Sequence, residues 1–206
     1  MPSTANKALD IAEQLAQTRG FNGFSCADIA AELHITKASL HYHFASKAEL
    51  GRALVTRYTA AFQQALSAIQ GAAPERLRRY VQLYESVLVR DRMCLCGMLA
   101  AEYSTLPAPM QEELHRFFDL NDVWLALTLE QGREARELTF EGSGIEAART
   151  LTAGLEGAML LARSYEEPGR FAVAAQRLLA QVGVSRPPAE SAAPTRRAAS
   201  PGKRRT

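Results

Sequence analysis

The amino-acid sequence predicts an all-α protein, and three observations support this. Ala, Leu, Glu, Gln and Arg, which favour helices, dominate the composition, whereas strand-forming residues are sparse. Apolar residues recur with the i, i+3, i+4, i+7 spacing of amphipathic helices along most of the 206 residues. Glycine and proline fall mainly between these stretches, where they end one helix before the next begins.

Three short helices are expected near the N-terminus. Residues 8–15 carry the first amphipathic stripe, which ends before Gly20. Ser25 and Asp28 have the spacing of a capping box, which predicts the start of a second helix. Thr36 is expected to cap a third helix of about eight residues. A tight turn separates the second helix from the third, so this segment predicts a helix-turn-helix.

A longer fourth helix should follow directly. Ser46 and Glu49 repeat the capping-box pattern, and an apolar stripe then runs from residue 50 to residue 69. Similar stripes predict five further helices, at about residues 77–88, 94–103, 110–137, 145–165 and 168–182. The sequence therefore predicts a head of short helices joined to a bundle of longer ones.

The net charge of +2 hides an uneven distribution. Residues 186–206 hold six basic residues against one acid, whereas the preceding 185 residues hold 18 basic and 21 acidic residues. This tail, rich in Pro, Ala, Ser and Arg, is predicted to be disordered, and serves either solubility or non-specific attraction to phosphates. Global charge is consequently no argument for nucleic-acid binding, and a local signal is needed.

That local signal lies in the helix-turn-helix, residues 24–44. Leu33, Ile35, Leu40 and Phe44 are apolar at positions that would lock the second and third helices together. Between residues 33 and 47 there are two lysines, three histidines and no acid. In a helix-turn-helix the third helix enters the major groove of DNA, so this electropositive face points to a DNA-binding function.

At these residues the chain resembles the TetR/AcrR family of bacterial repressors. The similarity runs from about residue 9 to residue 54, and its core is the segment ITKASLHYHFASKAEL. Two positions depart from the family pattern. His34 stands where the family usually has the turn glycine, which favours a positive φ. His41 replaces a more usual tyrosine, so the operator sequence cannot be carried over.

The resemblance implies roles for individual residues. The third helix would present its first residues to base edges, whereas later residues and the start of the fourth helix would hold phosphates. The DNA-contacting set implied in this way is Ser25, Thr36, Lys37, Ala38, Ser39, His41, Tyr42, His43 and Lys47. Lys47 in particular is expected to bind a phosphate together with the free N–H groups of its helix.

The resemblance also implies a domain organisation and an assembly. Residues 1–50 would form the DNA-binding head, residues 51–185 the regulatory and dimerisation domain, and residues 186–206 the tail. A homodimer would place two third helices on a near-palindromic double-stranded operator, roughly 34–36 Å apart. Small residues at 153–154, 157–158 and 162 could pack at the dimer interface or, alternatively, inside one subunit.

Two hypotheses concern the signal that releases the operator. The first is a small apolar ligand bound among the side chains of Tyr84, Met98, Phe117 and Trp124, a set that could equally be plain core. The second is modification of Cys94 or Cys96 by an electrophile. Arg90, Arg92 and a helix N-terminus would favour the thiolate, although buried cysteines are often inert.

The segment CLCGMLAAE, from Cys94 to Glu102, strengthens the second hypothesis. It is similar to the NemR-type sub-branch of the family, whose members respond to electrophiles and hypochlorite. In that sub-branch a reactive cysteine lies at the position that aligns with Cys94. The resemblance therefore implies a ligand- or thiol-responsive repressor.

Other classes of function find little support in the sequence. No phosphate-binding loop, metal-ligand set or catalytic triad is recognisable, so neither an enzyme nor a cofactor or metal site is expected. No apolar stretch is long enough for a membrane span, and the N-terminus lacks a signal-peptide pattern, so a cytoplasmic protein is expected. The alternative is a helical protein-interaction module that does not bind DNA specifically.

Overall fold

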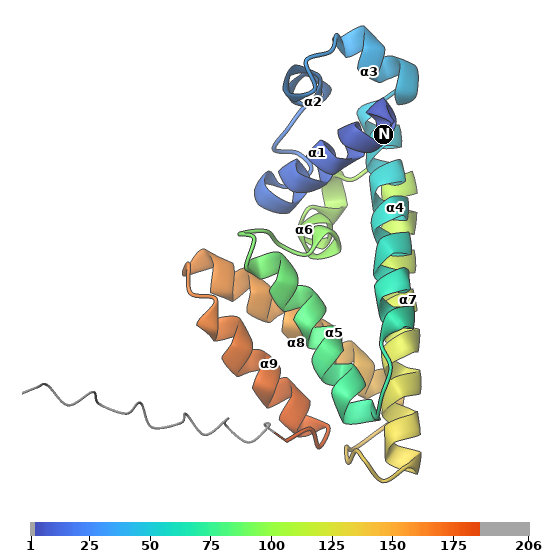
Figure 1. The fold of residues 1–206 in the computed structure, drawn as a ribbon, viewed down its shortest axis with the longest axis vertical. Helices are drawn as coiled ribbons and strands as arrows, with labels where there is room; N and C mark the ends of the chain where they lie inside the picture. Colours follow the sequence, from blue (N-terminus) through green and yellow to red (C-terminus); the bar gives the residue numbers. More distant parts are fainter. Residues whose placement is uncertain (1–2, 186–206) are drawn as a thin grey trace, which may run out of the picture.

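A computed structural model describes residues 3–185, and within that range the chain is helical without any strand (Figure 1). The all-α prediction is therefore confirmed for the described part of the chain. The tail predicted at residues 186–206 lies outside the described residues. None of the described helices combines the length and the apolar character that a membrane span requires.

The head is formed by α1 (Thr4–Arg19), α2 (Cys26–Glu32) and α3 (Lys37–His43), at the top of Figure 1. The capping box is present, because the Asp28 amide donates to the Ser25 hydroxyl and the Ser25 amide donates to the Asp28 carboxylate. The Ser39 amide donates to the Thr36 hydroxyl over 3.1 Å, which confirms the predicted cap of α3. These local signals set where the two helices of the motif begin.

The turn between α2 and α3 contains the expected strained residue. His34 has φ +56°, a left-handed conformation that glycine adopts more easily than histidine. Leu40 is buried beneath the two helices, and Leu33, Ile35 and Phe44 pack against the core beside it. The predicted apolar lock of the helix-turn-helix is confirmed.

The long helix α4 (Lys47–Ala68) leaves the head and continues into the bundle. Ser46 accepts a hydrogen bond from the Glu49 amide over 3.1 Å, whereas the Glu49 carboxylate accepts from Ala45 rather than from Ser46. The second capping pattern is thus formed, but the amide that donates to the Glu49 carboxylate is one residue earlier than predicted. The predicted domain boundary at residue 50 falls inside this helix, so no break in secondary structure marks it.

The bundle contains α5 (Ala73–Leu88), α6 (Leu95–Ala101), α7 (Ala108–Glu134), α8 (Gly144–Ser164) and α9 (Gly169–Gln181). In Figure 1, α7 runs beside α4, and α8 packs against both α7 and α9. The predicted helix at residues 94–103 is shorter, because it ends before a 3₁₀ turn at Tyr103–Thr105. Pro109 lies in the first turn of α7, where a missing N–H costs little.

An aromatic cluster fills the centre of the bundle. Phe62 packs on Phe117 with ring centroids 5.2 Å apart, and Tyr80 stacks on Trp124 at 5.7 Å. The Tyr80 hydroxyl donates to Asn121 Oδ1 over 2.9 Å and lies 3.1 Å from the hydroxyl of Tyr84. Their buried polar atoms therefore have partners, which stabilises a single packing of α4, α5 and α7.

The small residues of α8 divide between two faces. A side chain at Gly154 would lie 2.7 Å from Leu178 of α9, and Ala158 and Ala162 are buried. At Gly154 the close approach is between α8 and α9 of one subunit, which is the alternative expected for this position. Gly157 and the exposed Ala153 face outward instead, and a Cβ atom at Gly157 would meet no described atom within 4 Å.

Candidate DNA-binding face and its link to the regulatory helices

The outer face of α3 carries most of the residues that the sequence singled out. Thr36, Lys37, Ala38 and Ser39 are all exposed at its N-terminal end. Tyr42 is 87% exposed, which is unusual for an aromatic side chain. This face therefore combines a cation, hydroxyl groups and an aromatic ring at one end of the molecule (Figure 1).

The two histidines at the end of α3 differ in their surroundings. His43 is exposed, and its ring meets that of Tyr42 edge-on, with centroids 5.4 Å apart. His41 is half-buried, and its Nδ1 lies 3.3 Å from the carbonyl oxygen of Phe44, the residue that ends the helix. His43 is thus free to reach outward, whereas His41 also holds the C-terminal end of α3.

Lys47 lies differently from what the sequence suggested. Its ammonium donates hydrogen bonds to the carbonyl oxygens of Phe21 and Phe24, and it sits over both aromatic rings at about 4.5 Å. Burial lowers the pKa of Lys47 below its usual value. The expectation that Lys47 offers its charge to a phosphate needs correction, because here the charge holds the α1–α2 loop against α4.

Glu102, at the C-terminal end of α6, holds the same loop from the other side. Its carboxylate accepts hydrogen bonds from the amides of Phe21, over 2.6 Å, and Asn22, over 3.3 Å. Gly20 has φ +79°, and a side chain there would lie 2.6 Å from Glu102. The loop thus gives its N–H groups to Glu102 and its carbonyl groups to Lys47, which joins α6 to the head.

Two further contacts connect the head to the bundle. Arg163, near the end of α8, donates to the carbonyl oxygens of Gln17 and Thr18 over 2.8 and 2.7 Å. These carbonyls belong to the last turn of α1, where no partner exists within the helix and a cation is favourable. The Met93 amide, just before α6, donates to the Gln17 carbonyl over 3.2 Å. The position of α1 therefore depends on α6 and α8.

Cys94 and Cys96 are buried where α6 begins. Cys94 is the N-cap residue of α6 and is only 2% exposed, and Cys96 is fully buried. Burial, and then the nearby Glu156 carboxyl, raise the pKa of the Cys94 thiol well above its usual value. The predicted activation by Arg90 and Arg92 is wrong, because desolvation outweighs it and Arg92 turns away to donate to Gln14.

Glu156, on α8, is the polar group that sequence reasoning missed. It is the only charged residue between Leu151 and Ala162, an otherwise apolar stretch that could have signalled its burial. Burial raises its pKa to about 7. Neither carboxyl oxygen has a hydrogen-bond partner of normal geometry among the described residues. Burying a carboxyl without a good hydrogen-bond partner costs folding free energy. Packing alone therefore does not explain why an acid stands at this position.

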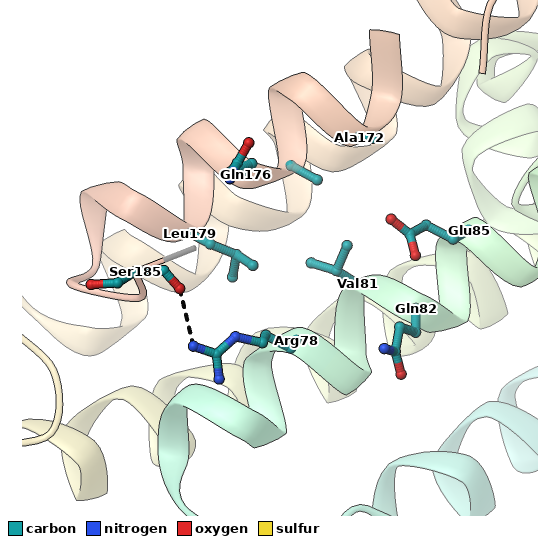
Figure 2. A pocket seen from close by; sticks show the side chains of 9 residues that line it. Arg78, Val81, Gln82, Glu85, Ala172, Gln176, Leu179 and Ser185 are labelled. Atoms are coloured by element: carbon teal, nitrogen blue, oxygen red, sulfur yellow. Dashed lines mark hydrogen bonds between the residues drawn. The ribbon is translucent and has the colours of Figure 1, made fainter. Parts of the chain in front are cut away.

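The candidates for an apolar ligand site pack into the core instead of lining a cleft. Tyr84 and Phe117 are buried in the aromatic cluster, and Met98 and Trp124 pack against it. A separate cleft of about 250 Å³ lies between α5 and α9. Figure 2 shows it between Val81 and Leu179, with Arg78 donating to the carbonyl of Ser185 at one end. Its volume lies below the range of typical ligand pockets.

The match to known families covers both parts of the chain. Residues 8–54 match the model of bacterial regulatory proteins of the tetR family, and residues 73–178 match the tetracyclin repressor-like C-terminal domain. The chain belongs to the TetR family. It is a helix-turn-helix transcriptional regulator, and α3 corresponds to the recognition helix of this motif.

Individual relatives agree with this assignment. The transcriptional repressor NemR of Escherichia coli is 30% identical over 173 residues, which cover 79% of this chain and 87% of NemR. Its reduced form superimposes with a TM-score of 0.77, covering 87% of this chain and 97% of that structure at 28% identity. A TetR-family regulator from Agrobacterium tumefaciens gives a TM-score of 0.84 at 29% identity, with coverage of 87% and 97%. The similarity to NemR confirms the resemblance expected for the C-terminal half.

Proposed function

We propose that this protein is a homodimeric repressor that blocks a near-palindromic operator and leaves it when Cys94 is modified. The observation that carries the second part is the placement of α6. This helix of seven residues has Cys94 at its start and Glu102 at its end. Glu102 in turn holds the α1–α2 loop of the head. A change at the thiol can therefore move the head through one short helix.

The first part rests on family membership and on the exposed face of α3. Lys37, Ala38 and Ser39 would meet base edges in the major groove, whereas Tyr42 and His43 would reach the sugar-phosphate backbone. Ser25 and Thr36 cap α2 and α3, and hydroxyls at such positions can also donate to a phosphate. Lys47 would contribute mainly by fixing the head rather than by binding DNA.

A dimer is supported by apolar side chains left exposed on α8 and α9. Leu161 is 59% exposed and Val173 is 64% exposed, and both line one surface hollow of about 810 Å³ between these helices. A two-fold pairing of this face would cover both side chains and present two recognition helices to one operator.

Release requires that a modified thiol stabilise a different arrangement of the heads. Cys94 is enclosed by packed side chains, so added atoms there cannot be accommodated without movement of α6. Movement of α6 displaces Glu102, and the contacts of Arg163 and Met93 with α1 change with it. The modification acts only to the extent that it favours the released arrangement over the bound one.

A small apolar ligand is the other inducer that the sequence suggested. It would have to open the packed aromatic cluster or occupy a surface hollow, such as the cleft between α5 and α9 shown in Figure 2. Because that cleft is small and the side chains that the sequence suggested do not line it, thiol modification has the better physical support.

Fluorescence anisotropy on the DNA upstream of the protein's own gene tests the proposal, with scrambled DNA and several salt concentrations. Selective binding of two subunits per site, lost after treatment with an electrophile and retained in a treated Cys94→Ser variant, is expected. Equal affinity for scrambled DNA contradicts the repressor proposal. If the treated Cys94→Ser variant still leaves the operator, the thiol mechanism is contradicted but the repressor proposal is not.

A further inference from the structure

The Glu156 carboxyl occupies an exceptional position between the thiol of Cys94 and the protein surface. It lies against the Cys94 thiol, and it also packs on Gly97, where a Cβ atom would collide with it. The carboxyl oxygens are inaccessible, whereas the rest of the side chain lines a surface groove of about 510 Å³ between α6, α7 and α8. Glu156 therefore separates the thiol from a route to solvent.

Among the described residues, no other group around Cys94 is suited to accept its proton. The Tyr58 hydroxyl lies 3.8 Å from Cys94 Sγ, but burial raises the pKa of Tyr58 well above its usual value. The titratable and charged groups around Glu156 are Tyr58 of α4, Tyr80 and Tyr84 of α5, Cys94 and Cys96 before and within α6, Asp122 of α7 and Arg149 of α8. Arg149 is paired with Asp122 across 3.3 Å.

We propose that Glu156 is the proton acceptor that makes the buried Cys94 reactive toward small, uncharged α,β-unsaturated aldehydes and ketones. The proposal deepens the thiol mechanism proposed above and rests on it for its biological meaning. A buried thiol without a base is inert, because it cannot form the thiolate in a low-dielectric site. A carboxylate in contact with the thiol removes this obstacle, as a general base does in nucleophilic catalysis.

The step balances without any further reactant. The sulfur of Cys94 bonds to the β-carbon of the electrophile, and the π electron pair moves toward the carbonyl group. Glu156 takes the thiol proton and returns it to the α-carbon, so nothing is oxidised or reduced and no group leaves. A carboxylate at the entrance repels anions and the packed site excludes large molecules, which selects a small neutral electrophile.

Labelling kinetics with methyl vinyl ketone test this role on the full-length protein. The rate of adduct formation at each cysteine is followed by peptide mass spectrometry from about pH 5 to about pH 9. In the wild-type protein the rate at Cys94 is expected to rise with pH and level off above the Glu156 pKa of about 7. The rate with the anion acrylate, relative to that with methyl vinyl ketone, should be far lower at Cys94 than for free cysteine, because the Glu156 carboxylate repels the anion.

The variant Glu156→Gln keeps the shape of the side chain but accepts no proton. We expect labelling of Cys94 to fall by at least about 100-fold, and the levelling with pH to disappear. Glu156→Asp retains a carboxyl and should recover part of the rate. Asp122→Asn removes the other carboxylate of the groove and should lower the rate far less than Glu156→Gln, because Asp122 is paired with Arg149 rather than with the thiol.

Wild-type labelling kinetics at Cys94 in Glu156→Gln, or no labelling of Cys94 in the wild-type protein, overturn the proposal. If Glu156→Gln proves unstable, the wild-type pH profile decides, since a tenfold rise per pH unit throughout shows direct thiolate attack without a base. A different result contradicts the proposed release mechanism: wild-type protein that is fully labelled at Cys94 and still binds its operator in the anisotropy assay. That result leaves the role of Glu156 as proton acceptor untouched.

Discussion

The buried carboxyl of Glu156 should give this protein an unusual dependence of stability on pH. Its pKa is raised from 4.5 to about 7 in the folded state, since burial favours the neutral form. In the unfolded chain the carboxyl ionises near its ordinary pKa. Between these two values the folded state holds a proton that the unfolded state has lost, so the free energy of unfolding falls as the pH rises.

The magnitude follows from the two pKa values. A rise from 4.5 to about 7 corresponds to about 3 kcal/mol, at about 1.4 kcal/mol for each tenfold change in proton affinity. The stabilisation relative to the ionised form is complete below about pH 4.5 and lost above about pH 7. Between about pH 5 and about pH 8 the loss amounts to about 2 to 3 kcal/mol, a large part of a typical folding free energy.

Urea denaturation of the wild-type protein and of Glu156→Gln at these two pH values measures the effect, with the protein concentration held constant. The difference in stability between variant and wild type should shift by about 2 to 3 kcal/mol in favour of the variant at the higher pH. Glu112→Gln, at an exposed position of α7, is the control and should leave the pH dependence unchanged. Parallel stability curves for the wild type and Glu156→Gln would refute the reasoning.

Four further predictions concern the head, its link to the bundle, and the assembly. Lys37→Ala should weaken operator binding more than binding to scrambled DNA, by about 1 to 3 kcal/mol in anisotropy titrations, whereas equal losses would remove Lys37 from base contact. Lys47→Ala should lower the stability of the folded head by about 1 to 3 kcal/mol in thermal unfolding, because two loop carbonyls lose a charged donor. Glu102→Ala should accelerate hydrogen exchange of the Phe21 and Asn22 amides at least about tenfold, as measured by mass spectrometry. Unchanged exchange would show that the hydrogen bonds from these amides to Glu102 do not stabilise the loop. The double change of Leu161 and Val173 to Glu should yield monomers in sedimentation velocity and abolish operator binding, and a persisting dimer would place the interface elsewhere.

The sequence by itself determined the helices and the DNA-binding motif. Ser25, Asp28 and Thr36 act on backbone groups within three residues of themselves, so their effect can be read from their spacing. The left-handed turn at His34 and the apolar lock around Leu40 are equally local. Because the motif lies in one continuous segment, both its fold and its family could be predicted.

Tertiary structure alone decided which groups meet across the bundle. Glu156 lies 62 positions after Cys94 in the sequence, and no local rule brings an acid on α8 to a thiol at the start of α6. The packing of these helices turned an expected reactive thiolate into a buried thiol beside a carboxyl. Glu102 contacts the α1–α2 loop over a sequence separation of about 80 residues. Lys47 points inward because its ammonium donates to two backbone carbonyls of the same loop. The hydrogen-bond partners and the pKa values of these charged groups depend on how deeply each group is buried. Burial results from the packing of several helices, so it cannot be inferred from one segment of the sequence.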